Sequence, residues 1–187
     1  LRNDHRNAIV GLLLTILQSS IFMMAFLLIY LIMGVRNSPI RGDFMLYLMS
    51  GIFMFMIHVQ TSGAVAGSHS VSGGLVKHQP LNPAILIASA ALAVLYRQTI
   101  SCIAILWLYH VLMTPIHFDF WPGSLAMYLL SWFSGGCIGL VFLGIRPWSP
   151  RASKLVTTAY QRINMFASGK FFVANMIPSF ILPWFAW

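Results

Sequence analysis

The sequence predicts an all-α integral membrane protein, a polytopic helical bundle with four clear spans and a fifth, irregular one. Of its 187 residues, 59% are hydrophobic and only 7% are charged, whereas charged residues make up roughly a quarter of a soluble domain. The apolar residues form several long uncharged runs, which excludes a single signal or anchor segment as their source. We therefore expect one transmembrane domain over residues 1–187.

Four runs are long enough to be membrane spans. A helix needs about 20 apolar residues to cross the hydrocarbon core of a bilayer. The second run is expected to end where small and polar residues begin at Gly67, and the third contains one charge, Arg97. Trp121 and Trp148 flank the fourth run, as expected at the two membrane interfaces. The predicted spans cover residues 8–35, 44–66, 84–113 and 122–145.

The last stretch, residues 155–187, is apolar overall but broken. Charged, polar and proline residues divide it into pieces that are too short to cross separately. We expect a helix followed by a partly re-entrant segment, which is tolerated at membrane depth only where protein or water surrounds it. The interrupting residues are Arg162, Lys170, Asn175, Pro178 and Pro183.

The cations between the runs indicate the orientation in the membrane. By the positive-inside rule, the amino end and the loops at 67–83 and 146–154 are cytoplasmic. The net charge of +8 is then a topology signal, and since the cations form no basic stripe with interleaved aromatics, we expect no nucleic-acid partner. The cytoplasmic side holds Arg2, Arg6, Lys77, Arg146, Arg151 and Lys154, and the opposite side holds Arg36 and Arg41.

Several kinds of chemistry are missing from the sequence. Asp4, Asp43 and Asp119 lie in predicted loops or at span ends, which argues against a carrier coupled to protons or sodium. There is neither a phosphate-binding loop nor a Gly-x-Ser-x-Gly motif. We therefore expect that the chain is not an enzyme. Cys102 and Cys137 show no pairing pattern and are interpreted as core residues.

Two histidines lie in neighbouring predicted spans. At 1.5 Å per residue, His58 is about 22 Å and His110 about 5 Å from the outer face, so they do not share one metal. Each is expected to be a hydrogen-bonded interior or interfacial residue, with a single-ligand haem or pigment role as the alternative. We assign no metal and no cofactor.

Two arginines lie within apolar stretches. Arg97 and Arg162 each cost at least about 2.5 kcal/mol at a helix centre unless they face a cavity or a partner. They either contribute to a polar pathway for an anionic substrate, or snorkel and pair with helix carbonyls. Tyr160, Gln161 and Asn164 surround Arg162 with more hydrogen-bonding groups than contact with lipid would allow, which favours the polar pathway there.

Small residues recur every four positions in two of the predicted spans. Ser131, Gly135 and Gly139 do so in the fourth, and Gly63 and Gly67 at the end of the second. Such spacing lets helix backbones approach closely. We expect these residues to pack helices within the bundle, with a dedicated dimer seam as the alternative.

Three stretches of sequence resemble a known family. They are YQRINMFASGKFFVANMIP at 160–178 closing on 184–187, IRGDF at 40–44 with YLMSG at 47–51, and VKHQPLN at 76–82. Over nearly its whole length the chain resembles the membrane subunit of type-2 ABC exporters for capsular polysaccharide and O-antigen. The polar elbow at 73–83, which by itself is either a turn or a docking site for a cytoplasmic partner, is part of that resemblance.

The resemblance implies a transmembrane permease domain of six spans, the last beyond Trp187, in the bacterial inner membrane. Two copies, surrounded by membrane lipids, would work beside two separately encoded ATP-binding subunits and move polysaccharide or lipid-linked glycan along a path between the two copies. The alternative is a permease-derived polytopic subunit with a structural or assembly role in a photosynthetic or respiratory complex. The coupling helix that docks on the ATPase would contain Leu75, Lys77, His78, Gln79, Pro80 and Asn82. The candidates for the substrate pathway are Tyr160, Arg162, Asn164 and Phe166.

Overall fold

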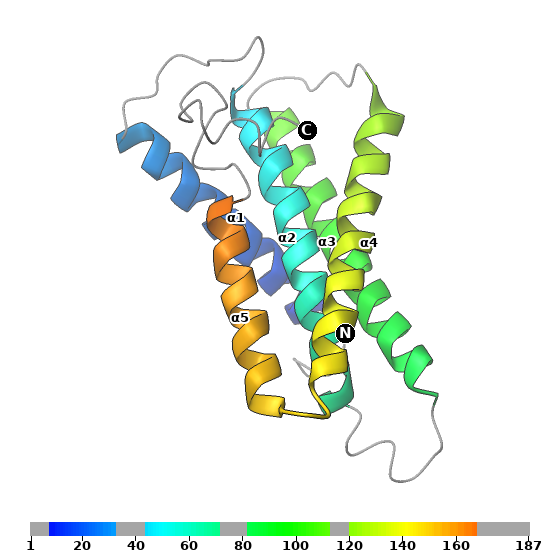
Figure 1. The fold of residues 1–187 in the computed structure, drawn as a ribbon. Helices are drawn as coiled ribbons and strands as arrows, with labels where there is room; N and C mark the ends of the chain where they lie inside the picture. The colour runs from blue at the N-terminus through cyan, green and yellow to red at the C-terminus, as the bar shows by residue number, and fades with distance from the viewer. Residues whose placement is uncertain (1–7, 33–43, 72–81, 113–119, 168–187) are drawn as a thin grey trace.

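The computed structural model describes residues 8–32, 44–71, 82–112 and 120–167, and these residues form helices and no strand. The prediction of an all-α bundle is confirmed. From α2 onward the helices alternate in direction, so that the end of α2, the start of α3 and the α4–α5 turn lie at one end of the bundle (Figure 1). The helices are α1 (Ala8–Ile32), α2 (Phe44–Val71), α3 (Pro83–Leu112), α4 (Trp121–Ile145) and α5 (Pro150–Ala167).

Three of the described helices are long and apolar enough to cross a membrane. They are α2 over Leu46–Ser68, α3 and α4, and they support a membrane-spanning bundle. The described part of the first predicted span forms α1, in which the apolar segment Leu13–Phe22 is shorter. A fourth span therefore stays a prediction.

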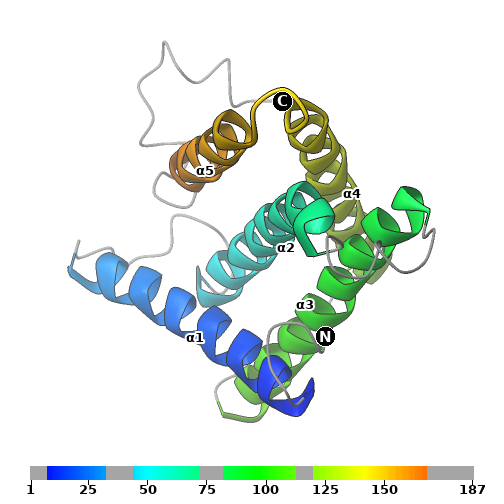
Figure 2. The ribbon, with the colours of Figure 1, turned by 90° about the horizontal axis from the view of Figure 1, so that it is seen from below.

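The central helix is α2. It contacts all four other described helices, and Figure 2 shows it between them. Large apolar side chains from α2 and α3 form the core, because the buried positions of α3 recur every three or four residues along one face. The core cluster consists of Leu48, Met49, Ile52, Phe53, Phe55, Met56, Ile105 and Tyr109.

The outer faces of α3 and α4 expose large apolar side chains. Trp107 is 65% and Leu112 68% exposed on α3, and Phe133 is 63% exposed on α4. Such a surface would be an aggregation liability in water but is the favourable surface against hydrocarbon. The exposure of these side chains is therefore consistent with a lipid-facing exterior.

Two predicted boundaries are wrong. The second span was expected to end at residue 66, but α2 continues to Val71, and Ser68 is buried within it with its hydroxyl donating to the Val65 carbonyl 2.8 Å away. A loop was expected over 146–154, but α5 begins at Pro150. Ser149 starts this helix: its Oγ accepts from the Ala152 amide and its carbonyl accepts from the Ser153 amide.

Because α5 begins at Pro150, two cations that were expected in a loop belong to this helix. Arg151 and Lys154 lie in the first two turns of α5, not in a loop between spans. The fifth segment was expected to start at residue 155, and its broken part at 168–187 lies outside the described residues.

Candidate functional site

Helix α4 approaches α2 through small residues. The Ser131 hydroxyl donates to the Met54 carbonyl at 2.8 Å. One turn further along α4, a Cβ on Gly135 would collide with the carbonyl oxygen of His58, and two turns along, a Cβ on Gly139 would lie 2.7 Å from Cβ of Val65. Residues four apart share one face of a helix, so these positions form the contact surface between α4 and α2.

Gly63 and Gly67 have different surroundings. A Cβ on Gly63 would lie 2.9 Å from Nε2 of Gln161 in α5, whereas a Cβ on Gly67 would meet nothing within 4 Å. Gly63 therefore makes room for a polar side chain of α5. Both glycines line a cavity beside α5.

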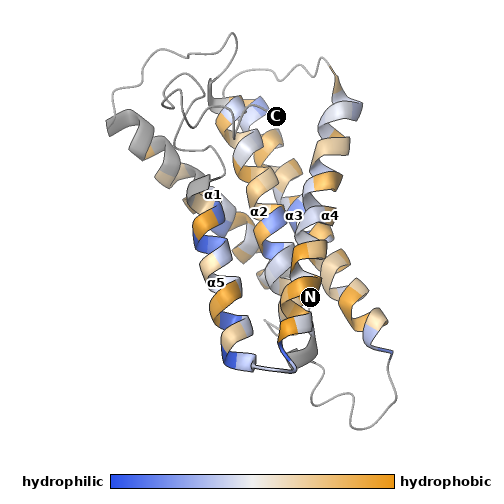
Figure 3. Ribbon diagram, viewed as in Figure 1, coloured by the Kyte–Doolittle hydropathy of each residue, from blue (hydrophilic) through white to orange (hydrophobic). Residues whose placement is uncertain are grey.

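The side of α5 that faces the bundle is polar. Thr157, Gln161 and Asn164 are half-buried there, whereas Leu155 and Ile163 are 70% and 66% exposed on the outer side. The exposed side is mixed, because Arg151, Lys154 and Arg162 are exposed there as well, so what distinguishes α5 is the polar lining of its interface with the bundle. Figure 3 shows strongly hydrophilic residues recurring along α5.

The imidazole of His58 joins three helices. Its Nε2 lies 2.8 Å from the Tyr160 hydroxyl of α5, and its Nδ1 lies 2.9 Å from Oγ of Ser134 and 3.2 Å from the Ser131 carbonyl of α4. The expectation that His58 is a hydrogen-bonded interior residue is confirmed.

These contacts define the tautomer of the neutral His58 ring. The Ser131 carbonyl can only accept, and the Ser134 hydroxyl already donates to that carbonyl at 2.9 Å. Nδ1 therefore carries the hydrogen and donates to both. Nε2 then has a free lone pair, and the Tyr160 hydroxyl donates to it.

Further contacts hold α5 along α2 and α4. Gln161 donates through Nε2 to the Val59 carbonyl at 3.3 Å. The ring of Tyr160 packs edge-on against Phe142 with 5.4 Å between centroids. The buried Ser153 hydroxyl donates to the Phe142 carbonyl at 2.7 Å. Polar contacts thus connect α5 to the bundle near its start and again in its second half.

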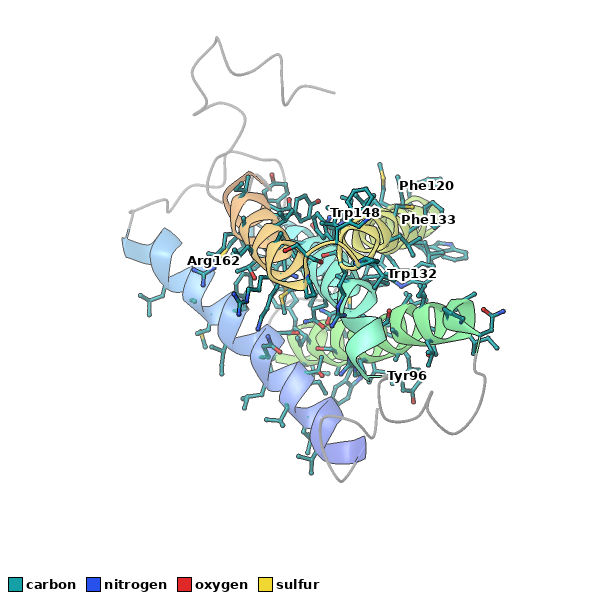
Figure 4. The ribbon with its side chains drawn as sticks, turned by 60° about the horizontal axis from the view of Figure 1, so that its bottom comes forward. Tyr96, Phe120, Trp132, Phe133, Trp148 and Arg162 are labelled. Atoms are coloured by element: carbon teal, nitrogen blue, oxygen red, sulfur yellow. The ribbon has the colours of Figure 1, made fainter. Side chains whose placement is uncertain are left out.

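The candidate pathway residues do not share one face. Tyr160 and Asn164 are half-buried on the inward side, but Arg162 is exposed. Figure 4 shows it on the flank of α5 directed away from α4. The reason is geometric, since residues two positions apart are rotated by about 200° around a helix. The side chain of Phe166 lies outside the described residues.

Most of the expected coupling segment, with Leu75, Lys77, His78, Gln79 and Pro80, also lies outside the described residues. Asn82 starts α3: its Oδ1 accepts from the Ala84 amide and its carbonyl from the Ile85 amide, both at 3.0 Å. Pro83 follows at the first helical position, where a missing amide hydrogen is harmless. Asn82 therefore has a structural role as the helix cap.

The sequence analysis missed the partnership of His58 with Ser134 and Tyr160. It expected a hydrogen-bonded interior or interfacial histidine but named none of its partners. Within the described residues, no group of His, Cys, Asp and Glu side chains is arranged to hold a metal ion. The site is instead a neutral hydrogen-bonded network between α2, α4 and α5.

No protein-family model matches the chain, and neither a curated protein nor a solved structure matches it. Its function is therefore inferred from its own sequence and geometry.

Proposed function

We propose that the chain is the membrane permease of an ABC exporter that moves polysaccharide or lipid-linked glycan across a bacterial inner membrane, with energy from a separate ATP-binding subunit. The supporting observation is the inward polar face of α5 beside long apolar helices. Polar side chains in a membrane bundle are costly and generally face its interior or a water-filled path. Thr157, Tyr160, Gln161 and Asn164 occupy such positions.

The proposed pathway lies between α5 and the pair α2–α4. Of the pathway residues expected from the sequence, Tyr160 and Asn164 belong to the proposed lining. His58, Ser134 and Gln161 complete it. These groups are neutral donors and acceptors, which suits the hydroxyl groups of a sugar. The hydrogen bonds between α5 and α2 contribute about 1 kcal/mol each, so α5 can exchange them for glycan contacts at little cost.

Energy would reach this interface from the cytoplasmic end. Closure of the ATP-binding subunits would act on the segment 75–82 and so on the ends of α2 and α3 that it connects. In the paired permease, separation of α5 from α2 would open the path. This mechanism requires a stable complex with a P-loop ATPase.

The first test is purification of the full-length protein from its native membrane in mild detergent, with its stoichiometric partners identified by mass spectrometry. An equimolar P-loop ATPase is the expected result. Stoichiometric retention in a respiratory or photosynthetic complex without an ATPase would contradict the proposal and establish a structural subunit.

The second test probes the pathway in proteoliposomes that contain the permease and its ATPase. In a background with Cys102 and Cys137 replaced by Ser, Asn164→Cys is expected to react with a membrane-impermeant maleimide faster during ATP turnover. Ile163→Cys is the matched control, because its side chain faces outward. Equal labelling at Asn164→Cys with and without ATP would contradict a pathway along α5.

A further inference from the structure

Two neighbouring cavities lie at the end of the bundle where α4 turns into α5. The basic cavity, of about 540 Å³, lies between α2 and α5 and is lined by Arg146, Arg151 and Lys154. The apolar cavity, of about 370 Å³, lies between the start of α3 and the end of α4 with the turn that follows it, and is lined mainly by apolar residues, including Leu86, Ile87 and Leu143. Arg146 and Pro150 line both cavities. Figure 4 views the bundle from this end, with Trp148 at the α4–α5 turn.

The basic cavity carries an excess of positive charge. The part of the chain that the structure describes contains no Asp and no Glu, so no carboxylate there offsets its cations. Arg146 is held in position because its Nη1 donates to the Ala66 carbonyl at 3.3 Å. A guanidinium has five N–H donors, and this bond uses one of them. The cavity therefore offers an anion one positioned guanidinium and two further cations, Arg151 and Lys154.

Two hydroxyl groups in the basic cavity can recognise a ligand by hydrogen bonding as well as by its charge. Thr157 Oγ1 donates to the Ser153 carbonyl at 2.8 Å, and Thr158 Oγ1 donates to the Lys154 carbonyl at 2.9 Å. Their hydrogens are thus directed into their own helix, and their oxygens offer lone pairs as acceptors. A ligand with both a phosphate and hydroxyl donors complements this lining.

We propose that the two cavities together bind a phosphatidylglycerol molecule of the cytoplasmic leaflet. Its phosphodiester lies among Arg146, Arg151 and Lys154, where guanidinium groups bind phosphate by paired charge-assisted hydrogen bonds. Its glycerol hydroxyls donate to Thr157 and Thr158, and one acyl chain lies along the apolar cavity. Phosphatidylethanolamine is disfavoured because its ammonium group is repelled by the three cations. Its cavity linings alone support the lipid site, which lies at the same α2–α5 interface as the proposed pathway.

The test uses native mass spectrometry of the purified full-length protein with dioleoyl phosphatidylglycerol or dioleoyl phosphatidylethanolamine. One molecule of phosphatidylglycerol is expected to stay bound. Lys154→Gln and Arg151→Gln should each weaken binding by about tenfold, the effect of losing one charge-assisted hydrogen bond. Arg162→Gln is the matched control, because it removes the same charge from α5 outside both cavities.

A second variant tests the apolar cavity. Ile87→Trp narrows it, and is expected to weaken binding of the dioleoyl lipid more than binding of dihexanoyl phosphatidylglycerol, whose short chains occupy less of the cavity. If Arg162→Gln and Lys154→Gln weakened lipid binding equally, the overall surface charge would account for binding, and the proposed site would be overturned. Equal binding of phosphatidylethanolamine, or displacement of phosphatidylglycerol by a polyisoprenyl phosphate at equal concentration, would overturn the assignment of the lipid.

Discussion

The hydroxyl group of Tyr160 lies 2.8 Å from Nε2 of His58 and donates the hydrogen bond that joins α5 to α2 inside the bundle. The other side of the same imidazole is bonded to Ser131 and Ser134 of α4. One ring therefore connects α2 with two consecutive helices, α4 and α5, whose bonding residues lie 73 to 102 positions further along the chain. Loss of the Tyr160 hydroxyl would leave Nε2 without its donor.

Tyr160→Phe is expected to lower the free energy of unfolding by about 1–2 kcal/mol, because it leaves a partly buried acceptor unsatisfied. Thermal unfolding in detergent measures the change. Tyr96→Phe is the matched control, since the Tyr96 side chain is 53% exposed on the outer side of α3.

A double-mutant cycle assigns this loss to the contact with His58. His58→Asn keeps a donor in the place of Nδ1 and removes Nε2, so that Tyr160→Phe should cost little in its background. If the two substitutions were additive, the hydrogen bond would not be the source of the stabilisation.

Gly135→Ala is expected to destabilise the protein by about 1–3 kcal/mol, the usual cost of overpacking. The added methyl group would collide with the backbone of His58, which cannot move aside as a flexible side chain can. Gly144→Ala in the same helix is the control, because a Cβ there meets nothing within 4 Å. Equal unfolding temperatures for the two variants would contradict a close approach of α4 to α2 at Gly135.

The helices could be predicted because their signals are local. An uncharged apolar run has to be helical in a membrane, and Asn82 with Pro83 marks the start of α3 to within one residue. The end of α2 was missed because Gly67 and Ser68 favour a loop by composition, whereas the burial of Ser68 within the bundle depends on tertiary structure that composition does not show.

The site could be predicted only in part. The polar residues of α5 were recognised from their density, but Arg162 was grouped with Tyr160 and Asn164 by sequence proximity rather than by helix face. The contact between His58 and Tyr160 spans 102 positions and arises only because α5 folds back along α2. No local pattern in the sequence carries that information.

Lys77→Ala and Pro80→Ala are expected to uncouple ATP hydrolysis from export if the proposed function is correct. Both residues belong to the expected docking segment, so the ATPase should stay active while glycan export falls. The measurement compares ATP turnover with glycan export in the reconstituted complex. Ser89→Ala is the control, because the Ser89 hydroxyl donates only to the Leu86 carbonyl of its own helix. Normal export in both loop variants would remove this segment from the coupling mechanism.

Gln98→Met is expected to stabilise the protein. The Gln98 side chain is fully buried in α3, and neither its amide nitrogen nor its oxygen has a hydrogen-bond partner among the described residues. Burying an unsatisfied amide costs about 1–3 kcal/mol, and methionine has a similar shape without that cost. Gln18→Met on the exposed side of α1 controls for the change in composition. A higher unfolding temperature for Gln98→Met alone is expected. A lower unfolding temperature would instead show that the Gln98 amide is hydrogen-bonded in the native protein, by a partner on the buried face of α3.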